Sequence, residues 1–264
     1  MQYVHFRDLT VSRLILGSNP FSGFSHQGIA TDWEMRRYFS GERIKQVLRQ
    51  SEALGVNTLI ARTDFHVMRL LLEYQEEGGS LQWFAQTCPE VGDHATCIQR
   101  AQDYGAKACH IHGGVMDHLY ATGRLAQEVP AALDLIRQKG MLAGVAAHSP
   151  RVIEWVEEHL AVDYYLCCYY NPNSRDKNPE HVPGAPERYL EEDRRAMTDL
   201  IQHLSRPVVH YKILAAGRND PASAFAFAAS KMRPGDAVCV GIYPKDQPGM
   251  LAEDVRLLEE KLGG

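Results

Sequence analysis

Short apolar runs alternate with amphipathic segments along the whole chain. Between Glu42 and Leu54 the apolar residues recur at helical spacing, which is typical of a helix that buries one face. Gly55 follows where a left-handed residue commonly ends a helix, and residues 57–64 then form an apolar run with the length of a strand. The same order of helix, glycine and strand recurs downstream. We predict eight strands, over residues 14–19, 57–64, 81–88, 107–112, 141–148, 162–170, 207–214 and 237–243.

Strands that alternate with helices indicate a parallel sheet. Eight such units in 264 residues fit a closed (β/α)8 barrel, the TIM-barrel fold, as one domain over residues 1–264. An open doubly wound sheet is the competing fold, and it usually carries a glycine-rich dinucleotide loop after its first strand. Residues 17–23 read GSNPFSG instead, and the chain has no P-loop, HExxH or GxSxG motif. The barrel is therefore the favoured fold.

One long segment, residues 171–186, is rich in asparagine, proline and charge and follows the sixth predicted strand. In a barrel it would stand over the carboxyl-terminal mouth, where active sites lie. A loop of this length is often functional, as a lid, but a mobile surface loop fits the sequence equally well.

The composition, 45% hydrophobic and 23% charged with a net charge of −5, is that of an ordinary globular protein. No basic run is longer than two residues, so nucleic acid is not an expected partner. No apolar run approaches the roughly 20 residues that cross a bilayer, and residues 1–10 lack a signal-peptide core, so no membrane association is expected. The six cysteines form no CxxC pair, which favours reduced core thiols and a cytoplasmic location. A homo-oligomer stays open, because the Ala/Phe-rich residues 222–229 fit either the barrel or a second subunit.

Polar residues collect where the predicted strands end, and these ends form the site in a barrel of this kind. Strand alternation places Arg62 with Asp64, His110 with His112, and His210 with Lys212 on common sides. If those sides face the barrel axis, the six groups converge on one pocket that binds a small-molecule substrate. The further candidates for substrate contact are Asn19, His26, His66, Gln86, His148, Asn171, His210, Tyr211, Arg218 and Tyr243.

Two readings of the histidines are open. The His110-x-His112 pair could hold a divalent metal, with His148, His210 or Asp64 completing the ligand set. The same pair could instead serve as acid/base groups, because imidazole titrates near neutral pH. Ordinary structural roles also compete, above all an ion pair between Arg62 and Asp64.

Eight short segments match the segments of one known family of barrels in the same order along the chain. They are Val11–Gly17, Gly55–Asn57, His110–His112, Gly144–Pro150, Tyr170–Pro172, Tyr211–Gly217, Tyr243–Asp246 and Glu253–Asp254. In these segments the chain distantly resembles the aldo-keto reductase superfamily. The resemblance implies a small hairpin before the first barrel strand, an active-site histidine at His112, a ring at Tyr211 that stacks on a nicotinamide, and Lys245 near an adenosine phosphate.

The departures from that family concern its chemistry. The family's catalytic Asp falls at Ile60 and its Tyr at Phe65, and no Lys ends the third strand; only His112 remains of that set. A phenylalanine has no proton to give to the alkoxide that forms in carbonyl reduction. The Ser-Asn pair that grips the nicotinamide amide falls on Ala146 and Ala147, and the corresponding Gln falls near Cys167.

Three functions follow as hypotheses. The first is a non-redox lyase, isomerase or hydrolase, without cofactor or with a divalent metal, for a small polar, carbohydrate-like or carbonyl substrate. It would use His112 as acid/base and Arg62 as anion binder. Asp64 would orient a histidine or act as the second acid/base group, Lys212 would be an oxyanion stabiliser or a Schiff-base amine, and His110 would lie beside them. The second is an NADP-dependent oxidoreductase with an altered proton donor, although NADP binding is not the favoured expectation. The third is a non-catalytic barrel that binds a small molecule.

Overall fold

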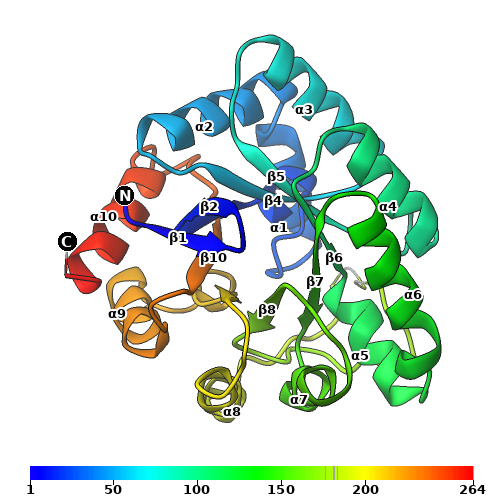
Figure 1. Ribbon diagram of the computed structural model, residues 1–264. Coiled ribbons are helices and arrows are strands. Elements are labelled where there is room, and N and C mark those ends of the chain that lie inside the picture. The colour runs from blue at the N-terminus through cyan, green and yellow to red at the C-terminus, as the bar shows by residue number, and fades with distance from the viewer. Residues whose placement is uncertain (176, 181, 183, 264) are drawn as a thin grey trace.

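Eight parallel strands close into a barrel that helices surround (Figure 1). The computed structural model describes residues 1–175, 177–180, 182 and 184–263. The predicted (β/α)8 barrel is confirmed, and each predicted strand is present with shorter bounds. The barrel strands are β3 (Leu14–Gly17), β4 (Thr58–Arg62), β5 (Gln82–Gln86), β6 (Ala108–Ile111), β7 (Leu142–Ala147), β8 (Tyr164–Cys168), β9 (Val208–Tyr211) and β10 (Ala237–Gly241), with β10 closing the ring between β9 and β3.

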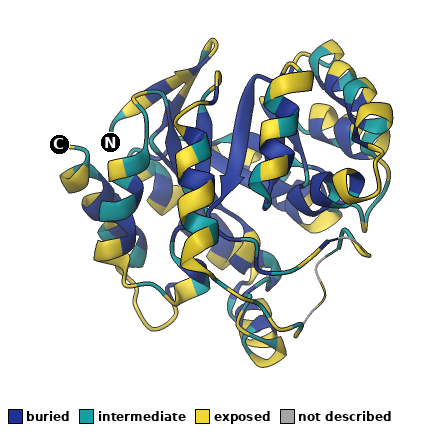
Figure 2. Ribbon diagram, turned by 90° about the horizontal axis from the view of Figure 1, so that it is seen from below, coloured by how far each residue is buried: buried dark blue, intermediate teal, exposed yellow. Residues whose placement is uncertain are grey.

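The helices bury one face against the barrel and expose the other (Figure 2). Several start at an acidic cap: Asp64 accepts the backbone N–H of Val67, and Asp220 that of Ser223. Two helices, over residues 29–38 and 113–121, were not predicted. The helices are α1 (Ile29–Tyr38), α2 (Gly41–Ala53), α3 (Phe65–Glu76), α4 (His94–Asp103), α5 (Gly113–Ala121), α6 (Leu125–Gln138), α7 (Pro150–His159), α8 (Glu191–Ile201), α9 (Pro221–Lys231) and α10 (Met250–Lys261).

An antiparallel hairpin, β1 (Tyr3–Phe6) and β2 (Leu9–Ser12), closes the amino-terminal end of the barrel, as the family resemblance implied. The Phe6 ring lies inside, with its centroid 6.2 Å from that of Phe84 and 5.8 Å from that of Tyr164. This half of the interior is therefore an apolar core. Any site must lie in the other half, above the carboxyl ends of the strands.

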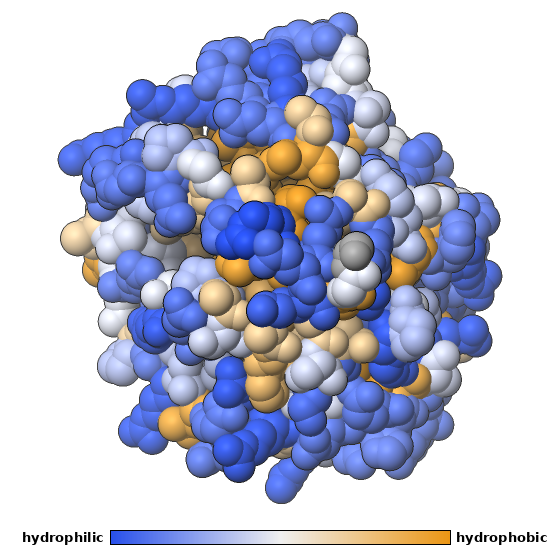
Figure 3. Space-filling view, turned by 90° about the vertical axis from the view of Figure 1, so that its left-hand side faces the viewer, coloured by the Kyte–Doolittle hydropathy of each residue, from blue (hydrophilic) through white to orange (hydrophobic). Residues whose placement is uncertain are grey.

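The outer surface is largely hydrophilic, with an apolar area near the middle of the face in Figure 3. The two termini lie side by side (Figure 1), and the amino-terminal ammonium pairs with Glu259 of α10. Within the described ranges, none of the helices combines the length and the apolar character that crossing a membrane requires.

Candidate functional site

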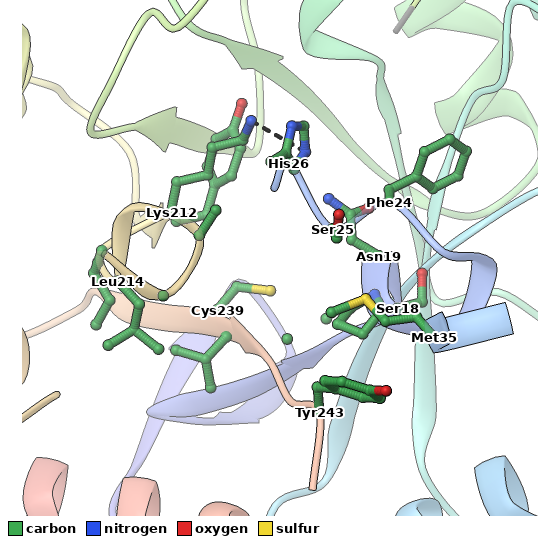
Figure 4. A pocket seen from close by; sticks show the side chains of 18 of the residues that line it. Ser18, Asn19, Phe24, Ser25, His26, Met35, Lys212, Leu214, Cys239 and Tyr243 are labelled. Carbon is green, nitrogen blue, oxygen red and sulfur yellow. Dashed lines mark hydrogen bonds between the residues drawn. The ribbon is translucent and has the colours of Figure 1, made fainter. Parts of the chain in front are cut away.

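A cavity of about 640 Å³ opens at the carboxyl ends of the strands. Its floor is formed by inward-facing residues of the barrel, among them Gln86, Tyr211 and Cys239. Its walls come from the loop after β3, the loop after β9 and the start of α10. Figure 4 shows Lys212 and Tyr243 on different sides of this cavity, with Cys239 between them.

Lys212 reaches the cavity because the backbone turns at the end of β9. On this strand Val209 and Tyr211 face the barrel interior, so regular alternation would send Lys212 outward. Its φ of +59° is left-handed instead, and its carbonyl accepts the N–H of Ala215 in a tight turn. A left-handed backbone is costly for a residue with a side chain and is often found at functional sites.

The Lys212 amine contacts a histidine that is itself held by a carboxylate. Lys212 Nζ lies 3.3 Å from His26 Nε2, and His26 Nδ1 lies 2.7 Å from Glu187 Oε1 (Figure 4 for the first contact). With Nδ1–H donating to Glu187, Nε2 carries the lone pair that can accept a hydrogen bond from Lys212. His26 also has a left-handed backbone, with φ +57°, and Arg218 donates to its carbonyl oxygen at 3.0 Å. Three segments far apart in sequence thus meet in one chain of contacts.

Burial sets the charge states in this group. It lowers the pKa of Lys212, and the charges of Arg175 and Arg218 act in the same direction, against those of Cys168 and Glu187. Burial would raise the pKa of Glu187, but hydrogen bonds from His26 and Tyr189 outweigh it and bring the pKa to about 2. Glu187 is therefore an anion at neutral pH, and Lys212 loses its proton more readily than a surface lysine.

Arg62 faces the cavity, as alternation predicted, but its donors are already engaged. Its Nε donates to Asp64 Oδ2 at 3.1 Å, and its Nη2 donates to Glu90 Oε2 at 3.1 Å. The guanidinium also lies over the Phe24 ring, 4.8 Å from its centroid. Asp64 does not line the cavity, because it caps α3. The pair therefore forms a structural ion pair at the cavity wall.

His112 and His148 lie beside the cavity rather than in its wall. His148 Nδ1 is 2.7 Å from Asp117 Oδ2, which orients the ring. His112 begins α5, and its buried Nδ1 has no hydrogen-bond partner among the described residues. Burial lowers the pKa of His112, and the charges of His148 and Arg62 add to this effect, so its ring is neutral. The loop after β8 covers this region closely, since a Cβ at Gly114 would collide with the carbonyl of Pro179.

His110 and His210 are away from the cavity, contrary to the expected convergence of six groups. His110 points into the barrel below the cavity, where its Nδ1 lies 3.2 Å from the Tyr164 hydroxyl and burial lowers its pKa to about 3. His210 faces the outer layer, because Tyr211 takes the inward direction on β9. There it contacts Asp236 at 3.2 Å and the hydroxyl of Tyr169 at 2.9 Å.

The remaining candidates divide between the cavity and its surroundings. Asn19, Gln86, Tyr211 and Tyr243 line the cavity. Four others lie outside the cavity wall. His66 is exposed on α3, and the backbone N–H of Asn171 donates to Asp193. Arg218 stacks on Tyr189, and Lys245 pairs with Glu34.

The four proposed metal ligands do not meet, since His110 and His210 lie on different sides of the barrel wall. In the part of the chain that the structure describes, no group of three His, Cys, Asp or Glu side chains is arranged to hold a metal ion.

Three side chains of this region were missed by the sequence reasoning. Glu187 and Arg175 lie in the segment between β8 and α8, and Asp254 lies on α10 at the far end of the cavity. None of them ends a strand, so the rule that found the others could not find them. The one signal in the sequence was the resemblance of Glu253–Asp254 to the segment that holds the adenosine phosphate in the aldo-keto reductases. That resemblance indicated phosphate binding rather than a buried carboxylate.

No protein-family model matches the chain, and no curated protein sequence matches it significantly. Solved structures do match, over nearly the whole length. A proposed aldo-keto reductase from Pseudomonas aeruginosa shares 15% identity, with 99% of this chain and 94% of that chain covered and a TM-score of 0.64. The aldo-keto reductase AKR11C1 from Bacillus halodurans, in holo form, shares 12%, with 98% and 90% covered and a TM-score of 0.61.

A truncated 3-deoxy-D-arabino-heptulosonate 7-phosphate synthase from Thermotoga maritima also matches, at 12% identity, with 99% and 91% covered and a TM-score of 0.54. The predicted resemblance to the aldo-keto reductases is thus confirmed for the fold. Identities this low establish the architecture, and function has to be argued from the site.

Proposed function

We propose that this barrel is a non-redox enzyme for a carbonyl substrate, with the Lys212 amine as nucleophile in a Schiff-base lyase reaction. The observation that carries the proposal is the contact chain that runs from Lys212 and His26 in the cavity wall to Glu187 behind them. A nucleophile, a base and a group that orients the base are the parts that covalent catalysis requires.

The balanced first step uses only these residues and the substrate. His26 Nε2 takes a proton from the Lys212 ammonium, and the imidazolium is stabilised by Glu187. The free amine attacks the carbonyl carbon, and a carbon–nitrogen bond forms as the carbonyl π bond breaks. One proton from the Lys212 nitrogen and the proton on His26 Nε2 then leave with the former carbonyl oxygen as water. His26 is then neutral again. The iminium left on Lys212 withdraws electrons from the neighbouring carbon–carbon or carbon–hydrogen bond, which is the basis of lyase chemistry.

The positions of the reductase machinery support a non-redox reaction. Phe65, where the family resemblance places the proton-donating Tyr, is 67% exposed and stacks with Arg100 at 4.4 Å. Ile60, at the place of the Asp, belongs to the apolar barrel interior. A proton donor beside a nicotinamide would have to come from other residues.

Reductive trapping tests the proposal. The protein is incubated with pyruvate or glyceraldehyde and borohydride, and peptides are mapped by mass spectrometry. We expect one adduct, on Lys212, that forms faster near pH 7 than adducts on surface lysines, because the pKa of Lys212 is lowered by burial. Lys212→Met should lose the adduct by at least ~10³-fold, while Lys231→Arg, a surface control, should retain it. Equal labelling of Lys212 and the surface lysines would contradict a role for Lys212 as the nucleophile.

An oxidoreductase is the second candidate, and one observation favours it. Tyr211, which the family resemblance places on the nicotinamide, does line the cavity. Titration with NADPH followed by fluorescence decides between the two. Tight binding, with the cofactor protecting Lys212 from trapping, would favour the oxidoreductase over the lyase.

A further inference from the structure

The cavity is lined by basic groups and by acidic groups in different parts of its wall. Its basic groups, Arg62, Lys212 and His26, lie on or near β4 and β9. Its acidic groups lie on α1 and around the start of α10, and two of them, Glu34 and Asp246, are near Tyr243. They are Glu34, Asp246, Glu253 and Asp254. We call this acidic part of the cavity the acidic arm.

Asp254 distinguishes the acidic arm from an ordinary cluster of surface carboxylates. It lines the cavity although only 3% of the residue is exposed, and its buried Oδ2 has no hydrogen-bond partner among the described residues. Burial, with the charge of Glu253 added, raises the pKa of Asp254 to about 7. A buried carboxylate without a partner is rare in folded proteins, and its presence needs an explanation. The Tyr243 hydroxyl, in the same arm, is likewise buried and unpartnered.

The basic side chains near the arm do not neutralise Asp254. Lys245 pairs with Glu34, and Arg256 pairs with Glu253 and Glu260; neither basic residue lines the cavity. Of the side chains that the structure describes in this arm, a phosphate would meet several carboxylates and no basic group. A ligand with a positive charge and N–H donors would supply what Asp254 lacks.

We propose that the acidic arm is a specificity subsite for an ammonium group, and that the substrate is an elongated molecule with its carbonyl at Lys212 and a cationic amine at Asp254. The substrate position, though not the subsite itself, rests on the proposed function. The cavity volume of about 640 Å³ is that of a site for an extended ligand rather than for a three-carbon molecule.

Calorimetric titration with matched probes tests the subsite without any reaction. The probes are 6-aminohexanoate, 6-hydroxyhexanoate and adipate, which share a carboxylate and a chain length but differ in the other end. We expect the amino compound to bind the wild-type protein at least tenfold more tightly than the other two. Asp254→Asn should abolish that preference, and Glu260→Gln, which removes an exposed carboxylate of the same helix, should retain it.

The outcome separates the two proposals. In Lys212→Met the preference for the amino compound should persist, even if reductive trapping has shown no Schiff base. Equal binding of the amino and hydroxy compounds by the wild-type protein would overturn the subsite, and this comparison needs no variant to fold. Displacement of 6-aminohexanoate by NADPH would overturn it as well, since the arm would then accept a phosphate-bearing cofactor.

Discussion

The polar groups on the outer side of β9 and those that line the cavity differ in how completely they are paired. On the outer side of β9, His210 bonds to Asp236 and Tyr169, and Asp236 also accepts hydrogen bonds from Val208 and Arg233. On the cavity side, Lys212 contacts His26 at the edge of a large open space, and Asp254 has an unpartnered oxygen. The first arrangement stabilises the fold, because every group is satisfied. The second leaves one carboxylate oxygen, that of Asp254, without a partner among the described residues.

The backbone shows the same contrast. Among the residues that the structure describes, five non-glycine residues have left-handed φ angles. Three of them, His26, Lys212 and Ala216, line the cavity, and Ala215 is in the same loop as Ala216. The fifth, Arg7, lies in the turn of the hairpin. None belongs to the His210–Asp236 cluster. Strain of this kind persists where the surrounding structure holds a side chain in a position that function requires.

The outer cluster should therefore determine stability and leave chemistry unchanged. Asp236→Asn removes the anion that His210 and Arg233 share, and we expect a loss of roughly 3 kcal/mol in the free energy of unfolding at pH 7. Hydrogen bonds and the Arg233 charge overcome burial and lower the pKa of Asp236 to about 2, so this stability is present above pH ~4 and is lost as the pH falls through 2. Urea unfolding measures the loss. Trapping at Lys212 should change by less than about twofold, and a large loss of trapping with intact stability would break the comparison.

The fold could be predicted from the sequence because the same order of helix and strand is repeated along the chain. Each strand is apolar on both sides, as buried parallel strands are, and each helix shows one apolar face. Helix α1 was not predicted, because its apolar positions do not form one buried face: Ile29 and Trp33 are exposed. The amino-terminal hairpin came from family resemblance rather than from periodicity.

The residues of the site could be predicted only in part, because strand alternation predicts side-chain direction only within regular strands. Alternation correctly placed Arg62 and His110 inward, because both lie within regular strands. It failed between His210 and Lys212, because one left-handed residue reversed the direction of the lysine side chain. Glu187 and Asp254 reach the site from a loop and a helix, and no periodicity of a strand encodes such contacts.

The unpaired carboxylate of the acidic arm should reduce stability, in contrast to Asp236. The pKa of Asp254 is raised by burial from 3.8 to about 7, so the folded state holds its proton more tightly than the unfolded state. The cost is absent at low pH, grows as the pH rises from about 4 to 7 and is complete above 7. We expect Asp254→Asn to raise the free energy of unfolding by about 2 kcal/mol at pH 8 and by much less at pH 4.5. Urea unfolding at both pH values checks this; Glu260→Gln should show no such pH dependence, and a destabilised Asp254→Asn protein at pH 8 would contradict the unpaired state.

The smallest expected effect concerns the strained backbone itself. Ala216 has a φ of +55° in the loop after β9, where glycine would be unstrained. We expect Ala216→Gly to stabilise the protein by about 0.5–1 kcal/mol, because the relief of the left-handed conformation exceeds the added chain entropy of the unfolded state. Ala226→Gly, in the interior of helix α9, is the matched control and should destabilise by a similar amount. Thermal unfolding of both variants gives the sign directly. Destabilisation by both substitutions would mean that the cavity-side backbone holds no strain, and the contrast between the two sides of β9 would then rest on side-chain pairing alone.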